Sequence, residues 1–171
     1  MDHVTLRAFH EADVDALLDI AVAAWTPVYE SFRSMLGEEL FEVAFPGWQH
    51  EKRRQIASAC RGEHGAVVIV VEAEGEPVGF ASYYLNCRTH VGEIGNNAVH
   101  PAYQGRGIGT RLYRHVIAEM REAGMAAVKV TTGGDPSHAP ARRAYEKAGF
   151  TGAIPSVTYY LDLRNDREKI H

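Results

Sequence analysis

Three runs of β-forming residues follow one another in the middle of the chain, and they constrain the fold more than any other feature. Ala66 to Val71 is a β-branched run, and Val78 to Leu85 reads as a second strand after a turn of glycine and proline. A short turn joins antiparallel neighbours, so these two runs predict a hairpin. His90 to Val99 alternates loosely and ends just before Pro101, which predicts a third strand closed by proline.

A crossover connection follows the third strand. The pattern predicts a helix from about Gly107 to Glu122 and a buried strand over Ala127 to Thr132. A strand that returns across a helix lies parallel to the strand before it, so the sheet must be mixed. A short helix over Ala139 to Ala148 and a last alternating strand over Val157 to Leu163 complete the pattern. We therefore predict an α/β (α+β) fold with a single mixed β-sheet and helices on both faces.

The first third of the chain is mostly helical in pattern. Val4 to Ala8 alternates as a short first strand, and a helical stripe opens at His10. Pro27 is expected to divide this helix from the next one. From Val28 to Cys60 the pattern predicts two or three short helical pieces, because glycine and proline interrupt it.

Length and composition favour one domain over residues 1–171. A chain of 171 residues can bury one core but is short for two ordinary domains. Apolar residues make up 46% and charged residues 23%, as in ordinary globular proteins. The net charge is −4 with acids and bases mixed, so no basic face indicates nucleic acid or an anionic membrane.

Cysteine and histidine patterns argue against a disulfide framework and against a metal site. Cys60 and Cys87 lie far apart and outside any CxxC pair, and the nine histidines show no HxxxH or HExxH spacing. The N-terminal residues 1–4 lack a signal-peptide pattern, and no apolar run approaches the roughly 20 residues that span a bilayer. We expect a cytoplasmic protein without a metal.

The turn between the third strand and its helix is rich in glycine. Residues 104–110 have the sequence QGRGIGT, and missing β-carbons let an anion approach backbone N–H groups. The helix N-terminus adds about half a positive charge, which favours a diphosphate. Two alternatives are a tight connection without a ligand and a dinucleotide site, although Thr110 occupies the third glycine position of the latter. A P-loop is excluded because no Gly-Lys-Ser or Gly-Lys-Thr follows.

Two segments carry a resemblance to a known family. Residues 99–101, of sequence VHP, together with 104–109 resemble the acyl-CoA-binding signature of the GNAT acetyltransferase superfamily. Residues 144–150, of sequence AYEKAGF, resemble the family's helix-to-strand segment with its frequent catalytic tyrosine. These motifs cover about 93–150, and the element order extends the resemblance over most of the chain. The resemblance implies a GNAT-like acyl-CoA N-acyltransferase fold with acetyl-CoA as co-substrate.

The resemblance also implies which residues bind the cofactor. Strand backbone would pair with the pantetheine arm between two splayed parallel strands, and the glycine-rich turn would surround the diphosphate. The implied binding residues are Asn97, Ala98, Val99, Gln104, Gly105, Arg106, Gly107, Ile108, Gly109 and Thr110. The N–H of Val99 is the implied group that polarises the thioester carbonyl. His138 stands where many members place an asparagine near the cofactor, which leaves its side-chain contact open.

Acyl transfer to an amine needs a base for the amine and a proton for the leaving thiolate. Glu93 resembles the base glutamate of part of the superfamily, and even spacing places it on the same face as Val99 unless a bulge intervenes. The alternatives are a merely solvated Glu93, with His90, Glu30 or a water chain as the base. Tyr145 is the proposed acid, and its alternative is a core aromatic role.

The remaining candidates concern the acceptor. No activated Cys–His arrangement is recognisable, which favours direct attack by the amine over a covalent intermediate. Aromatic residues could wall an acceptor pocket, and only one of two consecutive tyrosines on a strand can face a given pocket. These aromatic candidates are Trp25, Tyr29, Phe32, Tyr83 and Tyr84.

The sequence therefore predicts an N-acetyltransferase that moves an acetyl group from acetyl-CoA to an amine. The acceptor is expected to be a small molecule or a peptide, with no nucleic-acid or membrane partner, and a homodimer stays open. One alternative is a non-catalytic acyl-CoA-binding or regulatory module. Another is an acyltransferase that uses a different acyl group or a hydroxyl acceptor.

Overall fold

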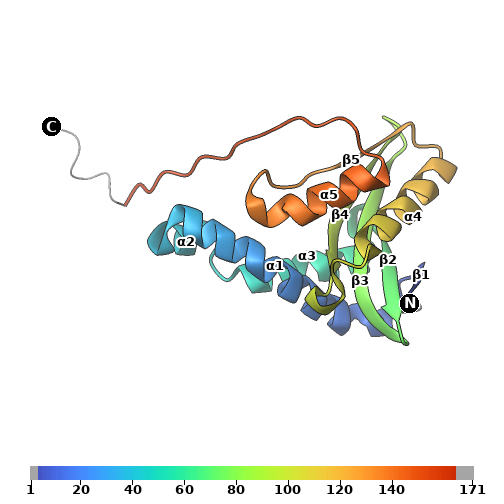
Figure 1. Cartoon of the computed structure of the whole chain (residues 1–171), viewed down its shortest axis with the longest axis horizontal. Helices are drawn as coiled ribbons and strands as arrows, with labels where there is room; N and C mark the ends of the chain where they lie inside the picture. The colour runs from blue at the N-terminus through green and yellow to red at the C-terminus, as the bar shows by residue number, and fades with distance from the viewer. Residues whose placement is uncertain (1–3, 165–171) are drawn as a thin grey trace.

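The predicted fold class is confirmed by the computed structural model, which describes residues 4–164. Residues 1–3, part of the segment read for a signal peptide, and residues 165–171 lie outside the described part. A single five-stranded sheet has the order β1-β2-β3-β4-β5 (Figure 1). The first four strands are antiparallel neighbours, and β5 lies parallel to β4. The strands are β1 Val4–Ala8, β2 Val67–Ala73, β3 Glu76–Asn86, β4 Val91–Val99 and β5 Ala127–Val130.

Helices cover both faces of this sheet, as predicted. They are α1 Val14–Leu36, α2 Glu38–Ala44, α3 Trp48–Cys60, α4 Ile108–Glu122 and α5 Ala139–Ala148. Leu17 of α1 and Ile56 of α3 pack with Phe80 in a core on one face. Leu112 of α4 and Tyr145 of α5 pack in a second core on the other face. No helix within residues 4–164 is long and apolar enough to cross a membrane.

The prediction that Pro27 divides the first helix is wrong, because α1 runs through it from Val14 to Leu36. A proline inside a helix removes one backbone hydrogen bond and crowds the preceding turn. Packing on both sides of the proline offsets this cost. Buried residues lie on both sides of the proline, among them Leu17 and Val28, so packing holds both halves together.

A bulge in β4 changes which residues share a face. Ala81 pairs with Asn97 whereas Tyr83 pairs with Ile94, so β4 has an extra residue between these pairs. Ile94 consequently belongs to the core under α4, and Ala98 to the core under α1, despite their even spacing. Val99 packs on the α4 side, and Glu93, next to Ile94, points to the opposite face. The bulge is the exception that the spacing argument allowed for, so Glu93 and Val99 lie on opposite faces.

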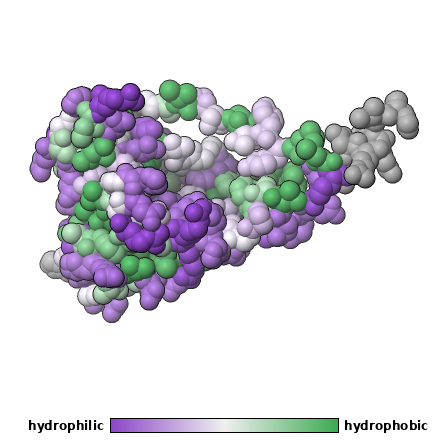
Figure 2. All heavy atoms as spheres, turned by 180° about the vertical axis from the view of Figure 1, so that it is seen from behind, coloured by the Kyte–Doolittle hydropathy of each residue, from purple (hydrophilic) through white to green (hydrophobic). Residues whose placement is uncertain are grey.

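The prediction of a last strand over Val157 to Leu163 is also wrong, because these residues form no strand and pair with none among the described residues. Residues 151–164, here named the C-terminal arm, leave the end of α5 and run to α2 (Figure 1). The ring of Tyr160 lies 5.8 Å from that of Phe45, and the Arg164 guanidinium donates to the Glu39 carbonyl at 2.9 Å. Figure 2 shows hydrophobic side chains along the arm, which stands off the rest of the molecule.

An ion pair between β1 and the start of α1 predicts a measurable acid sensitivity. Arg7 donates to both carboxylate oxygens of Asp13, at 2.8 and 2.9 Å, and the N–H of His10 donates to the same carboxylate at 2.8 Å. The Arg7 hydrogen bond is the main cause that lowers the pKa of Asp13, against the opposing effect of burial. The pair therefore stabilises the fold above the ordinary aspartate pKa, and this stability is lost as the pH falls through the lowered value.

We expect Asp13→Asn to lower the free energy of unfolding by about 2 kcal/mol at pH 7, because it weakens hydrogen bonds to a buried charge. The deficit should shrink as the pH falls below about 4, since the wild type loses the same contribution there. Urea denaturation at several pH values measures both effects. Asp15→Asn, on the exposed side of the same helical turn, is the matched control and should change stability little. An unchanged Asp13→Asn variant at pH 7 would contradict the assignment.

Candidate active site

The sheet opens between β4 and β5. The two strands pair only over Val91–Ile94 and Ala127–Val130, and β4 then continues to Val99 beside β3 alone. The N–H of His100 bonds back to the Val78 carbonyl of β3 at 2.8 Å. Because N–H groups alternate sides along a strand, the N–H of Val99 points away from β3, toward the opening. The predicted splaying of two parallel strands is confirmed, and it leaves strand backbone free to pair with an extended ligand.

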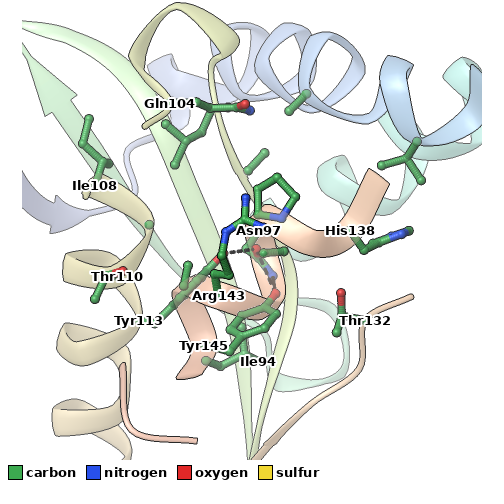
Figure 3. Close-up of a pocket in the computed structure, with 18 of the residues that line it drawn as sticks. Ile94, Asn97, Gln104, Ile108, Thr110, Tyr113, Thr132, His138, Arg143 and Tyr145 are labelled. Atoms are coloured by element: carbon green, nitrogen blue, oxygen red, sulfur yellow. Dashed lines mark hydrogen bonds between the residues drawn. The ribbon is translucent and has the colours of Figure 1, made fainter. Parts of the chain in front are cut away.

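A cavity of about 660 Å³ occupies this opening, between β4, α4, α5 and the middle of α1 (Figure 3). All predicted cofactor residues line it except Arg106. Glu93, Tyr145 and Trp25 line it as well. The sequence motifs therefore meet at one place in the fold.

The N-terminus of α4 faces the cavity through its glycines. Gly105 and Gly107 have φ of +76° and +79°, a left-handed conformation that favours glycine. The first helical hydrogen bond joins the N–H of Arg111 to the Gly107 carbonyl. The N–H groups of the preceding turn have no acceptor within the helix and carry its positive end. No side chain caps this terminus within the described chain, so these groups can bind an anion.

Cationic side chains lie close to the same helix end. Arg111, Arg114 and Lys147 line a shallow hollow that also borders Gly107 and Thr110. Arg106 instead lies over the Tyr103 ring at 5.2 Å and donates to the Ala102 carbonyl at 2.9 Å. A polyanionic ligand at the helix terminus would thus meet positive charge on the outer side of α4.

The Tyr145 hydroxyl is held over the cavity by Asn97. The Asn97 amide nitrogen donates to it at 3.1 Å, while the Asn97 carbonyl oxygen accepts from Tyr113 at 2.7 Å (Figure 3). Burial raises the pKa of Tyr145 above its ordinary value, and the hydrogen bonds with Asn97 and Tyr113 offset only part of this effect. Burial likewise raises the pKa of Tyr113. Both phenols therefore keep their protons at neutral pH, and the Tyr145 proton can be donated.

Glu93 lies at the edge of the cavity in an ion pair. Its carboxylate is 2.9 Å from the Lys129 ammonium of β5, and its side chain is 41% exposed. Because this carboxylate borders the cavity, it can accept a proton from a ligand bound there. His90 and Glu30, the alternative bases, do not line the cavity.

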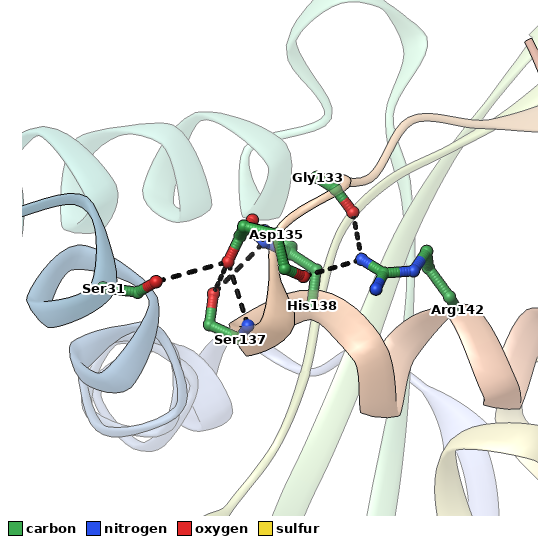
Figure 4. A network of polar contacts seen from close by, with 6 residues as sticks. All are labelled: Ser31, Gly133, Asp135, Ser137, His138 and Arg142. Atoms are coloured by element: carbon green, nitrogen blue, oxygen red, sulfur yellow. Dashed lines mark hydrogen bonds and ion pairs between the residues drawn. The ribbon is translucent and has the colours of Figure 1, made fainter. Parts of the chain in front are cut away.

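The cavity contains a second group that can accept a proton, and the sequence did not indicate this role for it. His138 lines the cavity, and its Nδ1 lies 2.5 Å from the Asp135 carboxylate, with both side chains about nine-tenths buried (Figure 4). Burial disfavours the ionised Asp135, but hydrogen bonds from Ser137 and His138 outweigh it and lower the Asp135 pKa. A carboxylate can only accept, so Nδ1 of a neutral His138 carries the proton and Nε2 stays free to accept one.

Asp135 also has a structural role. It is the N-cap of a short 3-10 turn, Pro136–His138, and accepts from the Ser137 N–H at 2.9 Å. Arg142 braces the turn by donating to the carbonyls of Gly133 and Asp135. The spacing Asp-x-x-His was the sequence signal that could have indicated the pair.

A buried lysine lies behind the part of the cavity wall that Trp25 and Asn96 form. The Lys52 ammonium is 3.7 Å from the centroid of the Trp25 ring, and donates to Asn96 and Gln55 at 3.1 and 2.9 Å. Burial lowers the pKa of Lys52 to about 8. Trp25 and Asn96 line the cavity and contact the Lys52 ammonium, so the positive charge of Lys52 lies directly behind the cavity wall. The position of the Lys52 ammonium depends on Trp25 and Asn96, which lie 27 and 44 positions away in the sequence. No local sequence pattern indicates such contacts.

Most of the predicted acceptor-pocket aromatics lie outside the cavity lining. Tyr29 stacks on Trp48 with ring centroids 4.1 Å apart, in a cluster between α1, α2 and α3. Tyr83 donates to Glu119 at 2.8 Å in the α4 core, and Tyr84 points to the other face. Trp25 is the member of the set that lines the cavity.

Comparisons with known proteins agree with this geometry. One solved structure is the PaiA N-acetyltransferase from Thermoplasma acidophilum in complex with coenzyme A, at 18% identity and TM-score 0.70, covering 90% of this chain and 93% of that one. Another is the ribosomal-protein-S18-alanine N-acetyltransferase from Escherichia coli, at 22% identity and TM-score 0.67, covering 95% and 86%. A third is a GNAT family acetyltransferase from Brucella melitensis in complex with acetyl-CoA, at 22% identity and TM-score 0.61, covering 89% and 85%.

These likenesses define the fold class as that of the acetyltransferases. A family model described as the acetyltransferase (GNAT) family matches residues 25–150, which is most of the chain. The chain belongs to the GNAT acetyltransferase family. Residues 4–164 contain no group of three or more histidine, cysteine, aspartate or glutamate side chains placed to hold a metal ion.

Proposed function

We propose that the protein is an N-acetyltransferase that transfers the acetyl group of acetyl-CoA directly to an amine. The observation that carries this proposal is the continuous cavity from the N-terminus of α4, along the free edge of β4, to Tyr145. A diphosphate, an extended amide-containing arm and a thioester fit these three parts in that order. The similar structures from Thermoplasma and Brucella were solved with coenzyme A or acetyl-CoA, which supports the choice of co-substrate.

The binding residues act mainly through backbone. The N–H groups of Ile108, Gly109 and Thr110 hold the diphosphate, and Arg111 and Arg114 lie where a further phosphate of the nucleotide would be neutralised. The cavity edge of β4 pairs with the two amides of the pantetheine arm. The N–H of Val99 then lies beside the thioester carbonyl and stabilises negative charge on its oxygen.

The chemical step needs three proton movements, because the nitrogen loses two protons and the sulfur gains one. Glu93 accepts the proton of the attacking ammonium, directly or through water, and the neutral amine attacks the carbonyl carbon. The C–S bond breaks as the tetrahedral intermediate collapses. Tyr145 gives its proton to the departing sulfur, and the nitrogen of the new amide loses its extra proton through water to the Tyr145 phenolate. His138, oriented by Asp135, is the second group in the cavity that can take the amine proton.

Release of free thiol from acetyl-CoA in the presence of an amine panel tests the proposal directly. The panel should contain polyamines, amino acids, an aminoglycoside and peptides with free N-termini or lysines, with mass spectrometry of each product. We expect acetylation of at least one amine class. Tight acetyl-CoA binding by calorimetry without transfer to any amine would favour a non-catalytic acyl-CoA-binding module. A product with an ester or a longer acyl group would favour the other alternative.

The pH dependence of the rate distinguishes the two proton acceptors. If Glu93 is the base, Glu93→Gln should lower kcat/KM at pH 7 by about 100-fold, and the loss should shrink at high pH, where more amine is neutral. His138→Asn should then keep the wild-type pH profile. The reverse pattern would assign the base to His138. Lys129→Met removes the ion-pair partner of Glu93 and leaves the Glu93 carboxylate in place. This variant therefore separates the effect of the ion pair on the rate from the effect of the base.

The protein is further proposed to act in the cytoplasm as one domain over residues 1–171. Both cysteines are free thiols, with Cys60 half-buried and Cys87 exposed, which suits a reducing compartment. The proposed acceptor is a small-molecule or peptide amine, because the Glu93 carboxylate and the Trp25 ring line the cavity.

A further inference from the structure

The buried charge of Lys52 has only neutral groups in contact with it. Lys52 is 5% exposed, and its ammonium contacts the Trp25 ring and two side-chain amide oxygens. The acidic group that acts on it is Glu51 of the same helix, but this carboxylate pairs with Arg54 at 2.8 Å. Burial lowers the pKa of Lys52 to about 8, so the ammonium is still mainly charged at pH 7. A positive charge thus lies behind the cavity wall with no carboxylate bonded to it.

Asn96 connects this charge to the cavity. An ammonium can only donate hydrogen bonds, so the side-chain oxygen of Asn96 faces Lys52, at 3.1 Å, and its NH2 group points away. Asn96 lines the cavity, and every buried side-chain nitrogen and oxygen within the described chain has a hydrogen-bond partner. The Asn96 NH2 group, which bonds to no described residue, is therefore open to a ligand. The positive charge on the other end of the amide strengthens it as a donor.

The same charge changes what the Trp25 ring can bind. An aromatic face attracts cations, and the Lys52 ammonium already occupies one face, 3.7 Å from the ring centroid. The first charge would repel a second ammonium on the cavity side of the ring, because the layer between them has a low dielectric constant. This part of the wall therefore disfavours a further cation and favours an anionic group.

Proton-accepting groups lie in the same cavity. The His138 ring is 6.1 Å from the Trp25 ring, and its Nδ1 is held by a carboxylate. Glu93 lines the cavity as well. A ligand with its amine at Glu93 or His138 and a carboxylate at Asn96 would match both kinds of group. A diamine would match the first and be repelled by the second.

We propose that Lys52 sets the charge class of the acceptor, so that the cavity takes a free amino acid in preference to a diamine. The carboxylate of the amino acid accepts hydrogen bonds from Asn96 and supplies a counterion for Lys52. Lys52 is thus a specificity-determining residue that acts through Asn96 and Trp25. The proposal rests on the proposed acetylation of amines, but ligand binding alone tests it.

Two matched ligand series separate the effect of charge from the reaction. Each has an acid, its amide and a diamine of the same length: glycine, glycinamide and ethylenediamine, then β-alanine, β-alaninamide and trimethylenediamine. Trp48→Phe leaves Trp25 as the only tryptophan, so its fluorescence reports binding to the protein saturated with coenzyme A. We expect the acid of at least one series to bind at least about tenfold more tightly than its diamine. Tighter binding of the diamines, or binding of neither acid, would overturn the proposal.

Two variants and a control assign the preference to Lys52. Lys52→Met removes the charge and keeps the chain length, so the acid-to-diamine affinity ratio should fall about tenfold. Asn96→Asp keeps the lysine but gives it a fixed carboxylate and removes the amide donor, so the same fall is expected without altering α3. Arg53→Met removes a charge from the neighbouring position, which is 42% exposed and paired with Asp19, and should keep the ratio. An unchanged ratio in a folded Lys52→Met protein or in Asn96→Asp, or an equal fall in Arg53→Met, would contradict the assignment.

The titration of Lys52 supplies a readout that a purely structural residue would not move. In the Trp48→Phe protein, Trp25 fluorescence should change with a midpoint near pH 8, because burial lowers the Lys52 pKa to about 8. Lys52→Met identifies this part of the curve, since His138 also faces Trp25. A bound carboxylate favours the charged lysine, so an acid that binds should raise the midpoint, and its affinity should fall as the pH rises through it.

A midpoint that the bound acid leaves unchanged or lowers would overturn the proposal. The outcome for the reaction is separate, because it is measured by thiol release from acetyl-CoA with the same two series. Acid-selective binding without acetylation of any amine would refute the proposed function and support the assigned role of Lys52.

Discussion

Replacing Tyr145 by phenylalanine should lower kcat by about 100-fold or more while the KM for acetyl-CoA changes little. The substitution removes one hydroxyl from a ring that stays packed against Tyr113, with centroids 4.6 Å apart. The burial that raises the Tyr145 pKa keeps the group protonated through neutral pH. The wild-type rate should therefore show no decline from loss of this proton below about pH 10. Steady-state kinetics from pH 6 to about 10 measure both effects.

Tyr113→Phe is the matched control for that experiment. It removes a hydroxyl that also bonds to Asn97, at 2.7 Å, but that does not donate to the leaving sulfur. We expect a loss below about tenfold, as for removal of one neutral hydrogen bond. Equal losses in both variants would indicate that Asn97 positioning matters rather than proton donation. An acyl donor with a more acidic thiol should reduce the Tyr145→Phe defect, because its thiolate leaves without a proton.

The order of the elements was predictable because each carries a local signal. Alternation marks Val4–Ala8 and the central hairpin, and the left-handed glycines fix the turn before α4. Pro27 was misleading because its local cost is overridden by packing on both sides, which only the tertiary structure reveals. The bulge in β4 leaves no mark in the hydrophobic pattern, so the face of Glu93 could not be derived from spacing.

The site shows the same division between local and distant causes. The turn and the α5 segment are continuous in sequence, so their residues could be named before the fold was known. Asn97 binds Tyr145 across 48 positions, and Lys52 binds Asn96 across 44, so these contacts depend on how the sheet brings helices together. The arm is a third case, because its alternating pattern predicts a strand, whereas the described structure has no neighbouring strand that pairs with it.

Gly109→Val should weaken coenzyme A binding by about 100-fold while leaving the fold intact. A β-carbon at Gly109 would lie 3.7 Å from Tyr113 and 3.9 Å from Ala144, both ordinary contacts with residues that line the cavity. The branched side chain would therefore project into the cavity and keep a diphosphate away from the N–H groups of the first turn. Loss of one or two hydrogen bonds to a charged group costs about 3 kcal/mol, which corresponds to about 100-fold in affinity.

Gly134→Val is the control, because Gly134 has open space around it and lies outside the cavity lining. Calorimetry with coenzyme A should show wild-type affinity for Gly134→Val and a large loss for Gly109→Val, with similar urea denaturation curves for both. Wild-type affinity in Gly109→Val would place the diphosphate elsewhere. The comparison is informative because Gly109, unlike Gly105 and Gly107, has an ordinary backbone conformation. A substitution there changes access to the amides without straining the turn that presents them.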